Sequence, residues 1–242
     1  MSTVALAPGK GSAVTIDCGN ESVRAINQAI RAAIAAGTKA IRLLRPDGRH
    51  NLGVALPEGV ELTIEGSAGY YVAGLNDGAS VLVRGGAGWG AGESMRDGTL
   101  VIEGHAANAV AASIRAGTVV VKGNASTRAG IAMKGGMLIV AGSVGPMAAF
   151  MMQKGALIVC GDAAEGLADS MYAGTVFLGG KHSELGADAV FEELTSADEE
   201  LIASSLERHK VTGPRAGFRK VVAGRRLWNF ERTQREFWKA AL

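Results

Sequence analysis

Hydrophobic and polar positions repeat along most of this chain with a period of nineteen residues. A glycine stands at every nineteenth position from Gly66 to Gly180, and each glycine closes a short aliphatic run such as LTIEG or VVVKG. Residues two apart on a strand point to the same face, so aliphatic residues two and four positions before each glycine predict one buried face. The two columns are Ile64, Val83, Ile102, Val121, Val140, Val159 and Leu178, and Leu62, Val81, Leu100, Val119, Leu138, Leu157 and Val176.

Other columns of the repeat are also regular. The residue just before the glycine is expected on the opposite face, and it is charged in the early copies and small in the late ones. The position seven after the glycine is small, and the position ten after it is expected to be buried, except at Asn76. A second glycine column, from Gly98 to Gly174, opens the strands. Both glycine columns suit corners that need positive φ or a close approach of two backbones.

A unit of nineteen residues is too small to fold alone, so the copies must stack and bury a continuous core. The runs are too short and too bounded by glycine for helices, and copies that run in the same sense pair as parallel strands about 4.8 Å apart. The leucine and asparagine consensus of leucine-rich repeats is absent. The sequence therefore predicts an all-β core over residues 55–190: a single-stranded right-handed parallel β-helix of about seven turns.

Residues 1–54 predict a helix and a capping segment at the start of the β-helix. The stretch VTIDCG predicts an edge strand, and apolar residues three and four apart predict an amphipathic helix over Ser22–Ala36. Asn20 or Ser22 is expected to cap this helix, and Gly37 to end it. A strand follows over Ala40–Leu44. The helix is expected to cover the N-terminal end of the stack.

Residues 191–242 predict a C-terminal helix followed by an extended tail. The helix is expected over Phe191–Arg208, with Ser196 as N-cap and Glu199 completing a capping box. A linker, residues 210–217, leads into a tail that is rich in arginine and aromatic residues.

Exposed aromatic and arginine residues are the candidate partner-binding residues, because these types dominate interface energetics. The first regular turns carry Tyr70, Tyr71 and Trp89 on a glycine-rich edge, for which local packing against the N-terminal helix is the alternative. The tail carries further candidates, and its alternatives are folding back along the β-helix or binding nucleic acid. These tail candidates are Arg225, Arg226, Trp228, Phe230 and Trp238.

No catalytic, cofactor-binding or metal-binding residue is predicted on this chain. The four histidines are far apart in sequence, and no metal-ligand spacing or nucleophile elbow is present. Asp162, Glu165 and Asp169 lie within one turn, but they are interpreted as solvated surface. The net charge of +2 indicates neither nucleic acid nor membrane as partner. With no signal peptide, no membrane-spanning run and two cysteines interpreted as reduced, a cytoplasmic protein is expected.

Two segments resemble a known family. GSAGYYVAGLNDGA (66–79) and GDAAEGLADSMYAGTVFLGG (161–180) are similar to turns of the GXGXG β-helix domain of glutamate synthase large subunits. As a free-standing protein, the chain most resembles the B subunits of methylamine–glutamate N-methyltransferases (N-methylglutamate synthases) and the related GlxC proteins.

This resemblance implies a non-catalytic scaffold in a hetero-oligomer that makes N-methylglutamate and ammonia from methylamine and glutamate. The implied partners are a glutaminase-like subunit and a synthase-like subunit, and FMN and iron–sulfur cofactors are implied on the latter, none on this chain. One alternative is the subunit with the same repeat domain in a formylmethanofuran dehydrogenase or formyltransferase/hydrolase complex. The other is a stand-alone binding β-helix.

Overall fold

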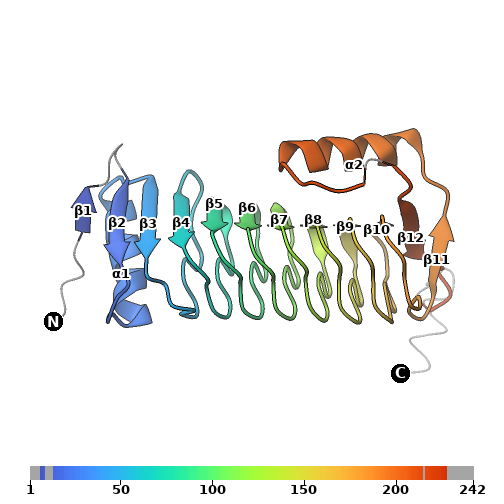
Figure 1. The fold of residues 1–242 in the computed structure, drawn as a ribbon, viewed down its shortest axis with the longest axis horizontal. Helices are drawn as coiled ribbons and strands as arrows, with labels where there is room; N and C mark the ends of the chain where they lie inside the picture. The colour runs from blue at the N-terminus through green and yellow to red at the C-terminus, as the bar shows by residue number, and fades with distance from the viewer. Residues whose placement is uncertain (1–5, 9–12, 215, 228–242) are drawn as a thin grey trace, which may run out of the picture.

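The computed structural model describes residues 6–8, 13–214 and 216–227, and in these residues twelve strands form one sheet along a rod (Figure 1). The sheet order is β1-β2-β3-β4-β5-β6-β7-β8-β9-β10-β12-β11. The strands are β1 (Leu6–Pro8), β2 (Val14–Asp17), β3 (Ala40–Leu44), β4 (Glu61–Glu65), β5 (Asp77–Val83), β6 (Asp97–Ile102), β7 (Thr118–Val121), β8 (Lys134–Val140), β9 (Lys154–Val159), β10 (Thr175–Leu178), β11 (Ala189–Glu192) and β12 (Arg219–Ala223). The helices in the described residues are α1 (Val23–Ala35) and α2 (Ser196–Arg208).

The predicted right-handed parallel β-helix of about seven turns is confirmed. Strands β2 to β10 are parallel, and from β4 onwards each core residue pairs with the residue nineteen positions later, as in Leu62 with Val81 and Val81 with Leu100. The opposite wall of the rod is a row of single parallel bridges that starts with Ala68 and Ala87 and ends at His182. Each rung of the rod therefore contains one nineteen-residue repeat.

Both glycine columns are required by the backbone, and the opening column has two requirements. The closing glycines form their own hydrogen-bond ladder, in which Gly104 N–H donates to the Gly85 carbonyl at 2.9 Å. A Cβ at Gly104 would lie 2.8 Å from the backbone nitrogen of Gly86, so close backbone approach excludes a side chain there. The opening glycines have positive φ as well as a close approach: at Gly117 φ is 80°, and a Cβ would lie 2.5 Å from the Gly98 carbonyl oxygen.

The core is formed by the predicted strand columns and by two loop columns that were not predicted, two and six positions after the closing glycine. The small column is buried except at Ala187, and most of its members have positive φ, as at Ala111 (57°). Two expectations in the next column were wrong. Asn76 is fully buried, because its amide bonds the backbone N–H and carbonyl of Ala79, and Val190 is 40% exposed in the edge strand β11. The buried loop columns are Ala68, Ala87, Ala106, Ala125, Val144 and Ala163, and Val72, Ala91, Val110, Ala129, Ala148 and Leu167.

The N-terminal helix forms as predicted. Ser22 caps α1, accepting a hydrogen bond from the Ala25 N–H at 3.2 Å. The apolar stripe of α1, which includes Ile26 and Ile30, is buried in the same core as the strands. The outermost element of the sheet at this end is the antiparallel strand β1, not α1, so the expectation that the helix covers the end was incomplete.

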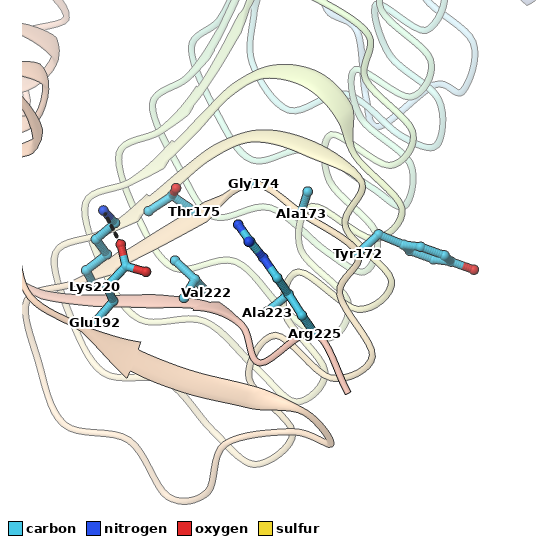
Figure 2. Close-up of a pocket in the computed structure, with 9 residues that line it drawn as sticks. All are labelled: Tyr172, Ala173, Gly174, Thr175, Glu192, Lys220, Val222, Ala223 and Arg225. Atoms are coloured by element: carbon cyan, nitrogen blue, oxygen red, sulfur yellow. Dashed lines mark ion pairs between the residues drawn. The ribbon is translucent and has the colours of Figure 1, made fainter. Parts of the chain in front are cut away.

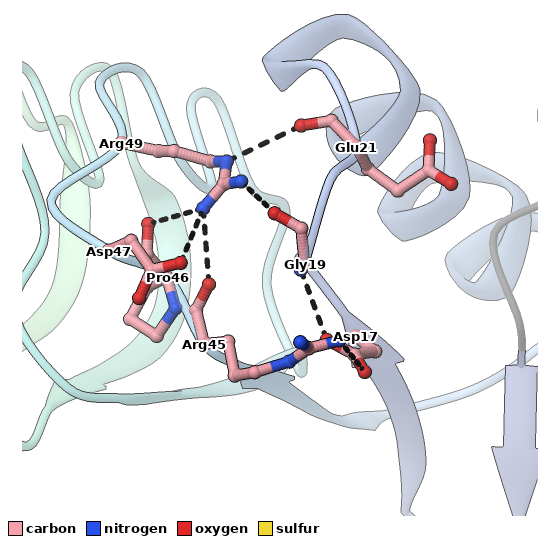
Figure 3. A network of polar contacts seen from close by, with 7 residues as sticks. All are labelled: Asp17, Gly19, Glu21, Arg45, Pro46, Asp47 and Arg49. Carbon is pink, nitrogen blue, oxygen red and sulfur yellow. Dashed lines mark hydrogen bonds and ion pairs between the residues drawn. The ribbon is translucent and has the colours of Figure 1, made fainter.

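Arg49 ties the entry of α1 to the first turns of the rod (Figure 3). Its guanidinium donates to the backbone carbonyls of Gly19, Glu21, Arg45 and Pro46, and it pairs with the Asp47 carboxylate at 3.2 Å. One side chain thus donates to four carbonyls of irregular backbone, which the regular strand ladder does not pair.

In the same corner, Arg45 pairs with Asp17, and this hydrogen-bonded ion pair holds the pKa of the Asp17 carboxyl below its ordinary value.

At the C-terminal end, three predictions need correction. Phe191 and Glu192, expected to start the helix, belong to strand β11. The N-cap of α2 is Thr195, one residue before Ser196, and Asp198 completes the capping box in place of Glu199. Part of the expected tail is strand β12, which lies antiparallel between β10 and β11.

Candidate partner-binding surfaces

The outer face of the sheet carries a second hydrophobic core under α2. The third residue before each closing glycine points outward, and from Val120 to Phe177 this column is buried. Helix α2 contributes Ile202 and Leu206 to the same cluster, and Figure 1 shows α2 lying along the late strands. This buried outer column was not predicted, although its aliphatic residues were the available signal. The buried members are Val120, Ile139, Ile158 and Phe177.

The change from charged to small residues just before the closing glycine marks where α2 lies. Lys122, the last charged member, donates from Nζ to the carbonyls of His209 and Lys210 at the C-terminus of α2. A cation there offsets the negative end of the helix dipole. After Lys122 the residues of this column are small, because the segment that follows α2 packs against them. At Gly213 in that segment, a Cβ would lie 2.7 Å from the Cys160 sulfur. Burial raises the pKa of the Cys160 thiol to about 11.

Two of the predicted partner-binding residues belong to an exposed aromatic stack. The rings of His50 and Tyr70 are 4.3 Å apart, and those of Tyr70 and Trp89 are 5.3 Å apart, with interplanar angles of 12° and 18°. Tyr70 is 47% exposed and Trp89 is 54% exposed. His50 lies in an irregular turn, so its place in the stack was not predicted. The Nδ1 atom of His50 accepts the Tyr70 backbone N–H at 2.9 Å, which fixes the ring.

Tyr71 has a different environment from its neighbour Tyr70. Its backbone has a positive φ of 60°, and its ring lies against Gly74, where a Cβ would be 2.4 Å from Cε1. Burial and the nearby charge of Glu93 raise the pKa of its hydroxyl. The Glu93 carboxylate lies over Gly90, the residue that follows Trp89, where a Cβ would also be 3.7 Å from Cδ2 of Tyr71. Local packing therefore covers part of the Tyr71 side chain, whereas the rings of Tyr70 and Trp89 are exposed to solvent.

The second predicted group lies at the C-terminal end of the rod. Arg225 lines a cavity of about 350 Å³ between β10, β12 and β11 and points toward Gly174, whereas Tyr172 points away (Figure 2). Lys220 in the same cavity pairs with Glu192 at 2.8 Å and with Asp198 at 3.1 Å.

Arg226 lies just beyond Arg225, and its backbone N–H donates to the Asp188 carboxylate at 2.9 Å. Both arginines are exposed. Trp228, Phe230 and Trp238 lie outside the described residues.

The described residues hold no group of three His, Cys, Asp or Glu side chains placed to bind a metal ion. Within the same part of the chain, no helix combines the length and the apolar character needed to cross a membrane.

The fold and its exposed surfaces define a class: a parallel β-solenoid whose sides carry aromatic and helical elements. Within this class, the GXGXG motif family model matches residues 46–241, and the chain belongs to that family. No curated protein sequence shows significant similarity to the chain.

Among solved structures, the chain is similar to one chain of the formyltransferase/hydrolase complex (FhcABCD) from Methylorubrum extorquens, a structure in complex with methylofuran. The TM-score is 0.62 at 23% sequence identity, and the match covers 81% of this chain and 84% of that chain. The expected GXGXG domain is therefore confirmed. The expected likeness to methylamine–glutamate N-methyltransferases has no support in these comparisons.

Proposed function

We propose that this chain is a scaffold subunit of a hetero-oligomeric enzyme complex of the formyltransferase/hydrolase type. The observation that carries the proposal is the extent of the structural match, which covers more than four fifths of both chains. A match of that extent corresponds to a whole subunit rather than to a shared fragment. In this proposal the catalytic groups and cofactors belong to the partner subunits.

The geometry of the rod suits a scaffold. Rungs that repeat in register cannot slide against one another, because every strand from β4 to β10 is paired on both sides. The exposed stack at Trp89 and the strand β10 are five rungs apart, which is about 24 Å at 4.8 Å per rung. Two different proteins could therefore be held at a fixed separation along one rigid element.

The candidate residues support binding rather than reaction. The aromatic stack is an exposed anchor of the kind found in interfaces, and Arg225 and Arg226 supply charge at the far end. Asp162 and Asp169 were predicted to be solvated surface residues. Their carboxylates accept hydrogen bonds from the backbone N–H groups of Lys181 and Ala187, which gives them a structural role in the turns.

The experiment is purification of the tagged full-length chain from its own cells, followed by identification of the bound subunits by mass spectrometry. We expect formyltransferase-like and amidohydrolase-like subunits in fixed stoichiometry. Glutaminase-like and FMN-dependent synthase-like subunits would instead restore the N-methylglutamate synthase interpretation. A chain that purifies alone at native concentration would overturn the scaffold proposal.

A further inference from the structure

The aromatic stack is not required by the repeat. At the position of Tyr70 and Trp89, four residues after the closing glycine, later turns carry Asn108, Thr127, Pro146, Glu165 and Glu184. From Asn108 to Glu165 these turns form the same corner with the same backbone ladder, so polar and small residues satisfy the fold there. Two large rings that remain about half exposed therefore point to a role outside the folding of the rod.

A carboxylate without an ion-pair partner lies over Gly90, the residue that follows Trp89 in the chain. The side chain of Glu93 folds over Gly90, since a Cβ at Gly90 would lie 2.8 Å from the Glu93 Oε2 atom. In the described part of the chain, the ion pairs involve other acidic residues and leave Glu93 without a cation. Arg49, which precedes His50, is fully engaged with Asp47 and backbone carbonyls.

We propose that the stack of His50, Tyr70 and Trp89, together with the Glu93 carboxylate, docks an arginine side chain presented by a partner subunit. This inference rests on the proposed scaffold function and names one of its contact surfaces. A guanidinium is planar, so it stacks on an aromatic face, and its fork of N–H donors matches a carboxylate. The stack and Glu93 supply both halves of this recognition.

Other occupants fit the surface less well. A nucleic acid would bring phosphates toward the Glu93 carboxylate, which repels them. A neutral aromatic group would use the ring face of Trp89 and leave Glu93 unpaired. A lysine ammonium would pair with Glu93, but it lacks the planar group that stacks over a ring.

The first measurement maps the contact in the native complex. The variant Trp89→p-benzoylphenylalanine is expressed in the source cells, and the cells are irradiated. The complex is then isolated and digested for mass spectrometry. We expect a cross-link to a single partner segment that contains arginine. A cross-link within this chain or to a second copy of it would overturn the inference, as would a partner segment without arginine.

The second measurement tests the charge. Glu93→Gln and Trp89→Ala should each weaken binding to the purified partner about thirtyfold or more, as expected for interface anchors. Glu165→Gln, an exposed carboxylate at the equivalent corner four rungs away, is the matched control and should bind like wild type. A charge exchange, Glu93→Arg with the partner's cross-linked arginine changed to glutamate, should restore binding.

Wild-type affinity of Glu93→Gln would overturn the arginine assignment. If the complex assembles but position 89 yields no cross-link, the inference fails and the scaffold function stands. If no complex is isolated at all, the scaffold function itself fails.

Discussion

The two cysteines allow the docking of α2 to be measured separately from the folding of the rod. Cys160 lies in the outer cluster beneath the segment that follows α2, whereas Cys18 lies in the inner core near the N-terminus. Burial raises the pKa of each thiol to about 11. At pH 8 roughly one thiol in a thousand is then ionised, and because the thiolate is the reactive form, both should label slowly.

The perturbation is Ile202→Ala in α2. Ile202 is 4% exposed and packs in the outer cluster. Truncation of a buried isoleucine to alanine costs about 2–5 kcal/mol. If α2 opens as a local unit, the whole cost appears in its opening equilibrium, which rises about thirtyfold at the lower end of that range. The exposed Leu201 on the same helix provides the control Leu201→Ala, which should change little.

The assay is labelling with iodoacetamide at pH 8, with each cysteine peptide quantified by mass spectrometry. In Ile202→Ala we expect Cys160 to react at least about thirtyfold faster than in wild type, because labelling follows the open population when opening is fast. Cys18 should keep its rate. Equal acceleration of both thiols would show that α2 and the rod unfold together. An unchanged Cys160 rate would refute the coverage of this cysteine by the α2 segment.

Three further outcomes follow from the packing. Val121→Asp places an unpaired carboxylate at a fully buried position, so its melting temperature should fall far below that of Val121→Ala, and a wild-type melting curve would mean that the strand faces are reversed. Removal of residues 214–242 deletes β12 and should lower the melting temperature and increase hydrogen exchange in β10, whereas unchanged exchange would show that β12 is dispensable. Lys122→Met should destabilise the last turn of α2 by about 0.5–1 kcal/mol, seen as faster exchange at residues 206–210, and unchanged exchange would remove the capping role.

The β-helix could be predicted because its evidence is repeated in every rung. A glycine such as Gly104 is required by the backbone of the neighbouring turn, so the same requirement recurs nineteen residues later. The buried column that contains Val121 recurs for the same reason. The period of the sequence therefore indicates how the turns stack in space. A single amphipathic segment predicts only its own secondary structure.

The elements that occur once could not be predicted in the same way. Strand β12 pairs with β10 across more than forty residues, and its sequence RKVVA is equally compatible with an exposed basic tail. The N-cap of α2 was misplaced by one residue because Thr195 and Ser196 both supply a suitable hydroxyl. Asp198 decides between them, since its carboxylate accepts the Thr195 N–H at 2.9 Å.

The candidate site was predicted only in part. The spacing of nineteen residues between Tyr70 and Trp89 places them on adjacent rungs, but His50 joins them from an irregular turn outside the period. Glu93 was not selected because a single acidic residue in a loop carries no pattern. The outer column under α2 was missed because each strand there is aliphatic on both faces, and only the small residues from Ala141 onward indicate what covers it.

The ends of the rod show why its sides are the better surfaces for partners. An unpaired strand at either end would template association with another copy. At the N-terminus β1 runs antiparallel to β2 and includes Pro8, a residue without a backbone N–H. At the other end, the outermost strand β11 has only four residues and finishes in Glu192, and the Arg219 guanidinium lies 5.2 Å from the ring centre of Phe191. These features oppose end-to-end stacking of copies, so in the proposed scaffold the ends are protected from self-association while the aromatic stack on the flank stays open to a different protein.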